Sequence, residues 1–396
     1  MFGWLTQIIA ITALNIRTIP RRLGSSAVAV VGVAGVVIVL VAVLSIGEGF
    51  RHALEGAGST SRALVLRNGA DSEMTSGIAG ADAEVIKQAP GIRHDGTQPL
   101  AASELFVIID VPKRSTSTAA NVPVRGVDQM SFKIRPELKI IDGRMLRFGT
   151  NEAVVGRSAS GQFQSLTMGS DVRSGELTLK VVGIFTQDGG IAESEIWADA
   201  ILLQGVYRRG HSFQVVNAQL DSADAFDAFK NWLTTNPQLN VQVKREKEYY
   251  AGQSVALTNL INTLGYGIAF LMALGAVFGA VLTMYTAVAT RTREIATLRA
   301  LGFSSFSVVV SVLGESIALA ALGGIIGGIG AYVGFNGYQT STMNFQTFSQ
   351  VAFAFAVTPA LLVQGLSYAL IMGLVGGFFP ALRAARLPIS SALREL

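Results

Sequence analysis

Residues 291–305, Arg-Thr-Arg-Glu-Ile-Ala-Thr-Leu-Arg-Ala-Leu-Gly-Phe-Ser-Ser, combine basic side chains with a short apolar repeat. Ile295, Leu298 and Leu301 recur every three residues, which predicts an apolar ridge along one side of a short helix. Two roles fit such a segment. Its arginines could hold a loop on the cytoplasmic side of a membrane, or its helix could dock in the groove of a partner protein.

The charged residues of this segment are also spaced for a helix. Glu294 lies three residues after Arg291, so the two side chains can pair on adjacent turns. Arg293 and Arg299 add positive charge, and Gly302 is expected to end the helix because glycine tolerates the left-handed conformation. Ser304 or Ser305 is expected to cap the helix that follows.

The sequence argues against several kinds of catalytic site. It has no cysteine, which excludes a thiolate nucleophile or thiolate metal ligands. It has no Gly-Lys pair and hence no Walker A loop, and no Gly-x-Ser-x-Gly elbow. The three histidines, His52, His94 and His211, lack metal-ligand spacing. The paired carboxylates Glu193/Glu195 and Asp224/Asp227 are expected to lie on solvated faces.

Glu315 is the one acid within a long apolar run. Ionisable groups inside a membrane are costly and often functional. Two roles remain open for it, packing against polar groups of a neighbouring helix and conformational coupling. A proton relay is not expected, because the apolar runs hold no second acid or histidine.

The chain contains three long stretches without any charged residue, which are Leu23–Gly47, Ala251–Thr290 and Ser316–Leu382. About 20 apolar residues suffice to span a membrane. With the apolar run near 306–334, the pattern predicts four transmembrane helices, at 23–47, 251–290, 306–335 and 352–380. A cytoplasmic helix at 291–305, an external loop at 336–351 and a tail at 381–396 complete this arrangement.

The charges outside residues 48–250 predict the orientation. They comprise nine arginines and only three acids, and every arginine lies before the first span, between the second and third, or after the fourth. Short loops rich in arginine stay in the cytoplasm. Both termini and residues 291–305 are therefore expected inside the cell, and residues 48–250 outside. Residues 1–22 are expected to form an amphipathic helix on the inner membrane surface.

Residues 48–250 have a balanced charge and alternate strand and helix patterns, which predicts a large α/β domain, expected to have two subdomains. The predicted strands are 63–67, 105–110, 122–126, 152–155, 177–185 and 214–220, and the predicted helices are 81–89, part of 192–207, and 221–234, with Asp221 as its N-cap.

The second charge-free stretch is too long for one membrane crossing. Forty helical residues would extend about 60 Å, twice the roughly 30 Å of hydrocarbon. Its first part carries polar side chains, so it is expected to begin as a stalk outside the membrane and to enter near Leu264. Pairs of small residues four apart, such as Gly275/Gly279, Gly323/Gly327 and Gly373/Gly377, are compatible with close helix packing within one chain or between two copies.

Several segments together resemble the MacB/FtsX-type ABC transporter permeases. They are residues 291–304 with Glu315 in the helix that follows, 380–394, Val124-Arg-Gly126, Asp142-Gly143-Arg144, Asn151-Glu-Ala-Val-Val-Gly156 and Val181-Val-Gly-Ile-Phe185. With the order of one span, one outer domain and three further spans, the resemblance covers essentially the whole chain. It implies a helical membrane protein with a large α/β periplasmic domain between its first two helices.

The resemblance also implies a function. Residues Arg291, Arg293, Glu294, Ile295, Leu298, Arg299, Leu301 and Gly302 would form the coupling helix that an ATPase grips. ATP and magnesium would bind to that separate ATPase dimer, so no cofactor, catalytic or metal residue is expected in this chain. A second permease chain, identical or different, membrane lipid and a periplasmic adaptor or substrate protein would be the other partners, without nucleic acid.

The expected location is the bacterial inner membrane, and the expected activity is ATP-driven export or extraction of a lipid, lipoprotein, peptide or small molecule. The alternative is an FtsX-like signalling subunit that activates a periplasmic enzyme. The loop at 336–351 is expected to be a plain short connection, with contact to an apolar cargo as the other reading.

Overall fold

The computed structural model describes residues 23–56 and 58–388. They form two compact units. The helical unit comprises the described residues up to Gly47, Leu260–Tyr338 and those from Phe355 onward, and the α/β unit comprises Glu48–Asn259 and Gln339–Ala354. The amphipathic helix expected over residues 1–22 and the end of the tail, 389–396, lie outside the described residues.

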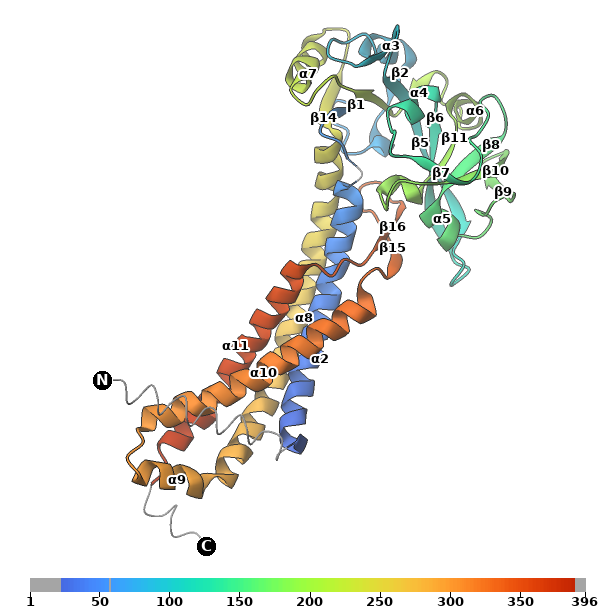
Figure 1. The fold of residues 1–396 in the computed structure, drawn as a ribbon. Helices are drawn as coiled ribbons and strands as arrows, with labels where there is room; N and C mark the ends of the chain where they lie inside the picture. Colours follow the sequence, from blue (N-terminus) through green and yellow to red (C-terminus); the bar gives the residue numbers. More distant parts are fainter. Residues whose placement is uncertain (1–22, 57, 389–396) are drawn as a thin grey trace. The chain divides into compact units, whose positions relative to one another are not determined.

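Four helices are long and apolar enough to cross a membrane (Figure 1). They are α2 (Leu23–Glu55), α8 (Glu246–Thr290), α10 (Ser305–Phe335) and α11 (Pro359–Ala385), and a short helix, α9 (Thr292–Ala300), separates α8 from α10. The prediction of four spans is confirmed. Helix α11 begins at Pro359 rather than 352, since Thr358 caps it by accepting a hydrogen bond from the Leu361 amide at 3.4 Å.

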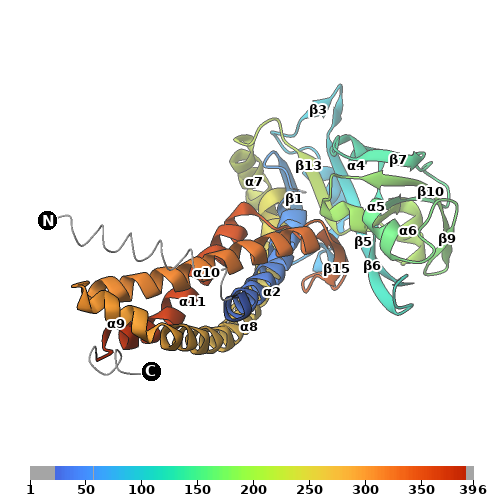
Figure 2. The ribbon, with the colours of Figure 1, turned by 60° about the horizontal axis from the view of Figure 1, so that its bottom comes forward.

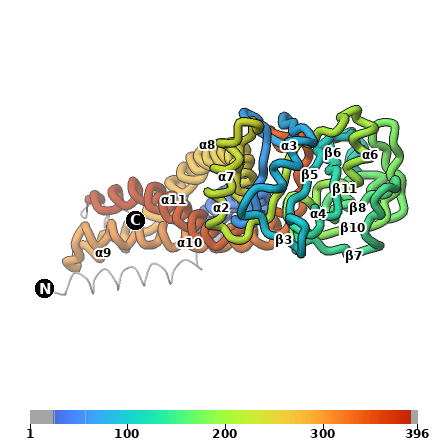
Figure 3. Tube along the Cα trace, turned by 90° about the horizontal axis from the view of Figure 1, so that it is seen from above, coloured from blue at the N-terminus to red at the C-terminus, as the bar shows by residue number. Residues whose placement is uncertain are grey.

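Small residues bring the helices of the helical unit close together. A Cβ atom on Gly327 would lie 2.7 Å from the Ala34 carbonyl oxygen of α2, and one on Gly373 would lie 2.5 Å from the Ala320 Cβ of α10. Helices α10 and α11 lie side by side (Figures 1 and 3), as α2 and α8 do (Figure 2). Among the described residues, the pair Gly275/Gly279 of α8 has no such neighbour within 4 Å, whereas Gly323/Gly327 of α10 and Gly373/Gly377 of α11 pack closely against neighbouring helices.

The α/β unit is built on a ten-stranded sheet in the order β14-β1-β13-β5-β6-β11-β8-β10-β7, with β9 paired to β10. Most neighbours are antiparallel, but β10 runs parallel to β8 and β11 runs parallel to β6. The strands are β1 (Arg62–Arg67), β5 (Ala101–Pro112), β6 (Ala119–Val127), β7 (Lys139–Gly143), β8 (Glu152–Gly156), β9 (Asp171–Ser174), β10 (Leu177–Thr186), β11 (Ile196–Asp199), β13 (Val215–Gln219) and β14 (Val241–Arg245).

Short helices and three strand pairs complete the α/β unit. The helices are α3 (Gly80–Ile86), α4 (Gln129–Lys133), α5 (Arg157–Gln162), α6 (Ala200–Val206) and α7 (Ala225–Thr235), with the 3-10 turns η2 (Glu73–Thr75) and η3 (Ile191–Ser194). The pairs are β2 (Ile78–Ala79) with β12 (Ser212–Phe213), β3 (His94–Asp95) with β4 (Gln98–Pro99), and β15 (Gln339–Met343) with β16 (Gln350–Ala354).

Three hydrophobic clusters lie on this one sheet, one of them around Phe185 and Trp197; the other two are larger. One gathers residues of β5, β6, β8, β10 and β11 around Phe163, and the other packs Phe226, Phe229 and Leu233 of α7 with β1, β13 and β14. The expected α/β class is confirmed, and each of the six predicted strands overlaps an observed one.

The helix expected in part of 192–207 is confirmed, since α6 occupies Ala200–Val206; the residues before it, Ile196–Asp199, form β11 and pair with β6 and β8. Two local predictions were wrong. Helix α7 begins after Asp224, not Asp221. Residues 336–351 are not a plain loop, since much of the segment forms the β15–β16 hairpin.

Candidate functional site

Helix α9 is the short polar helix that the sequence singled out. It occupies Thr292–Ala300, and Gly302 after it has φ of +96°, the left-handed conformation that ends helices without strain only at glycine. Ser304 caps α10 by accepting a hydrogen bond from the Ser307 amide at 3.1 Å. Both predicted boundary signals are therefore confirmed.

The inner face of α9 is packed against the other helices of the helical unit. Ile295 and Ala296 are buried. Ile295 belongs to an apolar cluster that joins α8, α10 and α11, with the members Val288, Val308, Val312, Ala381 and Ala384. A push on α9 therefore acts directly on three membrane helices, because interdigitated side chains transmit displacement.

A buried ion pair fixes the start of α9. The Arg291 Nη1 donates to the Glu315 Oε2 of α10 at 3.1 Å, and both side chains are less than a tenth exposed. Arg291 also lies 3.8 Å from Glu294, whose side chain is 68% exposed. Removal of one partner of a buried pair leaves an uncompensated charge, which makes this contact a strong constraint on the position of α9. Glu315 thus has a partner that the sequence did not specify.

The outer face of α9 is exposed. Arg293, Thr297 and Leu301 follow one another at four-residue spacing and are all exposed, Leu301 to 73%. The predicted ridge is therefore divided: Ile295 faces inward, Leu298 is half-buried, and Leu301 faces outward. Arg299 is also held inside, since its Nη1 donates to the Leu387 carbonyl at 2.6 Å.

A cavity of about 310 Å³ lies between α8, α9 and α10. Its lining is mostly apolar and includes the Arg291–Glu315 pair, together with exposed Glu294 and half-buried Leu298. The helix is thus held to its neighbours by the ion pair and the apolar cluster, with unfilled space beside it.

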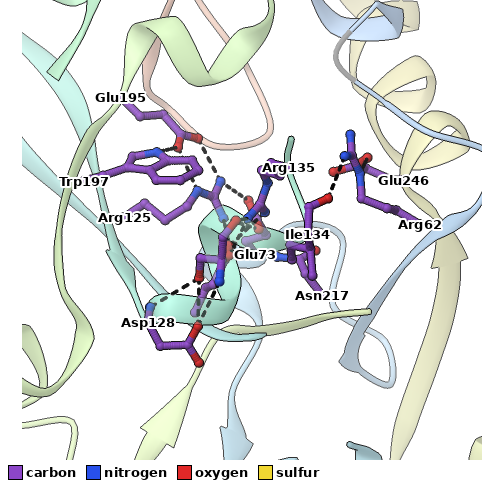
Figure 4. Close-up of polar contacts among 12 residues, drawn as sticks. Arg62, Glu73, Arg125, Asp128, Ile134, Arg135, Glu195, Trp197, Asn217 and Glu246 are labelled. Atoms are coloured by element: carbon purple, nitrogen blue, oxygen red, sulfur yellow. Dashed lines mark hydrogen bonds and ion pairs between the residues drawn. The ribbon is translucent and has the colours of Figure 1, made fainter. Parts of the chain in front are cut away.

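A second group of functional interest is a buried ion cluster in the α/β unit (Figure 4). Arg125 of β6 donates to Glu73 at 2.8 Å, to Glu104 at 3.0 Å and to Glu195 at 2.7 Å, and all four side chains are almost completely buried. Arg135 supplies a second bond to Glu104 at 2.5 Å. Burial of three carboxylates is tolerable only because these guanidinium groups satisfy them.

This cluster extends to the first turns of α8. The Glu246 carboxylate accepts from Arg62 of β1 at 2.6 Å, and the Tyr249 hydroxyl accepts from the Glu73 amide at 2.9 Å. Arg62 also donates to the Ile134 carbonyl at 2.9 Å (Figure 4). The start of α8 is therefore bonded to the sheet through several buried polar groups, so it moves with the α/β unit.

The expectation that Glu193 and Glu195 lie on a solvated face was wrong. Both are buried, with exposures of 2% and 3%. Glu195 accepts from Arg125 and from the Trp197 indole at 2.6 Å, and Glu193 accepts from the Thr186 hydroxyl and two backbone amides. The donors to Glu193 and the Trp197 indole are local in the sequence, whereas the pairing of β6 with β11 brings Arg125 to Glu195.

The pKa values of two carboxylates in the ion cluster, Glu104 and Glu73, are shifted in opposite directions. Burial disfavours the ionised form of Glu104, but Arg135 and Arg125 outweigh it and hold its pKa below the ordinary value of 4.5. Burial raises the pKa of Glu73 above 4.5 because Arg125 compensates only in part. At neutral pH the folded state thus favours ionised Glu104 and disfavours ionised Glu73, relative to the unfolded chain.

We therefore expect Glu104→Gln to lower the thermal unfolding temperature at pH 7 much more than Glu73→Gln does. The stabilisation from Glu104 is present above its unfolded pKa and is lost as the pH falls, so the deficit of Glu104→Gln should shrink when unfolding is measured near pH 4. Equal deficits for both variants at pH 7 would contradict the assigned roles.

Two of the motifs that resemble the permease family, Asp142-Gly143-Arg144 and Asn151-Glu-Ala-Val-Val-Gly156, meet at the surface of the α/β unit. Arg144 binds Glu152 through two bonds of 2.6 and 2.5 Å, and these bonds lower the pKa of Glu152 to about 2. Gly143 has φ of +74°, and a Cβ on Gly183 would lie 2.2 Å from the Arg144 carbonyl oxygen. These glycines therefore permit the close approach that places Arg144 on Glu152.

The described part of the chain contains no group of three histidines, aspartates, glutamates or cysteines placed to hold a metal ion. The chemically distinctive features of the described residues are helix α9 with its exposed face, the buried Arg291–Glu315 pair and the buried ion cluster around Arg125. Four helices able to span a membrane, an α/β domain between the first two and a short polar helix between the second and third define the architecture of a membrane protein with a large domain outside the spans.

Comparison with known families gives the class a name. The MacB-like periplasmic core domain matches residues 26–236, and the FtsX-like permease C-terminal domain matches residues 266–389. The chain belongs to the MacB/FtsX-type ABC transporter permeases.

Individual relatives are distant. The macrolide export ATP-binding/permease protein MacB of Burkholderia pseudomallei strain 1710b is 23% identical over 98% of this chain, which spans only 59% of that relative's length. The uncharacterized ABC transporter permease YknZ of Bacillus subtilis strain 168 is 25% identical, over 97% of this chain and 96% of its own length. The solved extracellular domain of a YknZ transporter from Gram-positive bacteria matches 46% of this chain at 16% identity, with a TM-score of 0.35.

Proposed function

We propose that this chain is the permease subunit of an ABC transporter, driven by a separate ATPase subunit that docks on α9. The observation that carries the proposal is the division of α9 into two faces. Ile295 and the Arg291–Glu315 pair fasten the inner face to the membrane helices, while Arg293, Thr297 and Leu301 leave the outer face open to a partner. Positive-inside anchoring alone would need the arginines but no fixed exposed face.

In this proposal ATP and magnesium bind to the partner, and this chain converts the partner's motion into movement of its helices. Displacement of α9 acts on α8, α10 and α11 through the apolar cluster around Ile295. Helix α8 is continuous over Glu246–Thr290, and its first turn is bonded to β1 through Glu246 and Arg62. Movement along α8 therefore has a direct route into the α/β unit.

The orientation follows from the same proposal. The ATPase is cytoplasmic, so α9 lies inside the cell and the α/β unit lies in the periplasm, as expected from the arginine distribution. The substrate is exported or extracted from the periplasm or membrane. A second permease chain would complete the transporter, and the face of α8 around Gly275 and Gly279 is available for close helix packing.

The proposal is tested by purification of the full chain from native membranes in a mild detergent. We expect a protein with a Gly-x-x-x-x-Gly-Lys-Ser/Thr sequence to purify with it and the complex to hydrolyse ATP. Recovery of the chain without such a protein and without ATP hydrolysis would contradict the proposal. Lipid or small-molecule cargo in the complex would indicate transport, whereas a bound periplasmic hydrolase would indicate the signalling alternative.

A further inference from the structure

The β15–β16 hairpin is formed by the segment that joins the third and fourth membrane helices. Its strands pair in register from Gln339–Ala354 to Met343–Gln350. It belongs to the α/β unit, although it is separated from the rest of that unit by α8, α9 and α10 in the sequence. Six of its residues are almost completely buried: Asn344, Thr347, Ser349, Val351, Ala352 and Phe353.

Side chains from several parts of the α/β unit hold the hairpin. The Ala352 amide donates to the Ser194 hydroxyl of η3 at 2.8 Å. Asn344 donates to Gln253 at the start of α8 at 2.7 Å, and this bond is buried. The Phe353 ring packs edge-on against Phe50 of α2, with ring centres 5.6 Å apart.

The two strands are also held at the tip and along one side. Asn121 of β6 donates to the Phe348 carbonyl at 2.7 Å, and Gln162 of α5 donates to the Thr340 carbonyl at 3.3 Å. Phe348 itself has φ of +53°, a conformation that is strained for a large side chain and persists only where the surroundings fix it. The hairpin is therefore a fixed part of the α/β unit.

The residues that connect the hairpin to the membrane helices are also hydrogen-bonded. The Gly337 amide donates to the Phe355 carbonyl, and the Phe355 amide donates to the Tyr338 carbonyl, each at 2.9 Å. The Asn336 side chain accepts from the Val357 amide at 3.0 Å. These bonds continue the antiparallel pairing from the hairpin to the ends of α10 and α11.

We infer that the hairpin is a second mechanical attachment, through which movement of α10 and α11 reaches η3 and the sheet in addition to the route along α8. The inference rests on the proposed function, because it needs a partner that moves α9. Helix α9 and its Arg291–Glu315 bond act on α10 directly, so the path from α9 through α10 to the hairpin is continuous in the chain. Glu195 and Trp197 of the ion cluster follow η3 immediately.

The test measures hydrogen exchange across residues 191–199 in the complex of the full chain with its ATPase, without nucleotide and with ATP trapped by vanadate. In the wild type we expect nucleotide to change exchange in this segment. The double variant Ser194→Ala/Asn344→Ala removes two bonds to the hairpin and should lose that change. Ser158→Ala removes a 3.1 Å bond from α5 to Glu193 in the same turn, and should retain it.

A disulfide between the hairpin and η3 provides a second test that does not depend on weakening the fold. The chain has no native cysteine, so Ser194→Cys/Ala352→Cys can form a disulfide without competing thiols. The oxidised double variant should keep the nucleotide-dependent change, because the hairpin and η3 stay together throughout the cycle. Loss of the change on oxidation, with recovery on reduction, would overturn the inference.

Two other outcomes would also overturn the inference: no nucleotide-dependent change in the wild type, or an unaltered change in Ser194→Ala/Asn344→Ala. Failure of the proposed function can be distinguished from failure of this inference, because in the first case no ATPase binds to any variant and no ATP is hydrolysed. Binding and hydrolysis are therefore measured first on every sample.

Discussion

Replacing Leu301 by aspartate should release the partner ATPase while leaving the chain folded in the membrane. Leu301 is 73% exposed directly after α9, so the substitution disturbs little packing among the described residues. A charged side chain at the centre of an apolar contact typically costs about 2–4 kcal/mol of binding, or roughly 30-fold or more in affinity. Co-purification of the ATPase and ATP hydrolysis by the membranes measure the loss.

A matched control is Ile201→Asp, which charges an equally exposed apolar residue, 75% exposed, on α6 of the α/β unit. It should retain full ATPase binding. Ile295→Asp is a poor test although Ile295 belongs to the sequence-derived ridge, because Ile295 is buried among α8, α10 and α11 and its replacement would disturb their packing. Unchanged ATPase binding by Leu301→Asp would show that the exposed face of α9 is not the docking surface.

Replacing Arg125 by leucine should destabilise the α/β unit more than any other single change considered for this chain. The substitution removes the arginine that pairs with Glu73, Glu104 and Glu195, and Arg135 remains as an ionic partner of Glu104 alone. Breaking a buried pair in this way costs about 3–5 kcal/mol, a large part of the stability of a typical domain. Thermal unfolding of the detergent-solubilised chain, followed by circular dichroism, measures the effect.

Arg144→Leu provides the comparison, because it also removes a doubly bonded arginine–glutamate pair, but one at the surface. Exposed pairs contribute little, so its unfolding temperature should stay close to that of the wild type. A loss for Arg125→Leu no greater than that for Arg144→Leu would mean that the cluster is not the constraint inferred from its burial.

The membrane helices could be predicted from sequence because hydropathy is local. Each span is a continuous apolar run, and the capping signals at Gly302 and Ser304 lie next to the helices they delimit. Six of the ten strands of the main sheet were predicted for the same reason, since apolar and β-branched residues cluster within each of these six; β7, β9, β11 and β14 were not predicted.

The buried ion cluster could not be predicted, because its members come from segments far apart in the sequence. Glu73, Glu104, Arg125 and Glu195 meet only after η2, β5, β6 and the turn before β11 are placed together. One signal was present: Arg125 is a charged residue within the apolar strand segment Asn121–Val127, and a charge in a buried strand requires a partner.

The β15–β16 hairpin was not predicted because its first strand is polar and carries no local sequence pattern typical of a strand. The first strand, Gln-Thr-Ser-Thr-Met, has no apolar alternation, and the hairpin is held by contacts with residues far away in the sequence: Gln162 bonds the first strand, and Ser194 and Phe50 contact the second. The coupling ridge was misjudged for a related reason. Periodicity placed Ile295 and Leu301 on one side of a helix, but only the packing of α8, α10 and α11 decides which of them is covered.

Site-specific cross-linking from position 301 tests most directly whether an ATPase docks on α9. The cysteine-free chain allows Leu301→Cys to be labelled alone with a photoreactive maleimide, and Leu322→Cys, 48% exposed on α10, serves as the control within the membrane. We expect illumination of native membranes to join position 301, but not 322, to a protein with a Walker A sequence. No such adduct at 301, or equal adducts at both positions, would contradict the account.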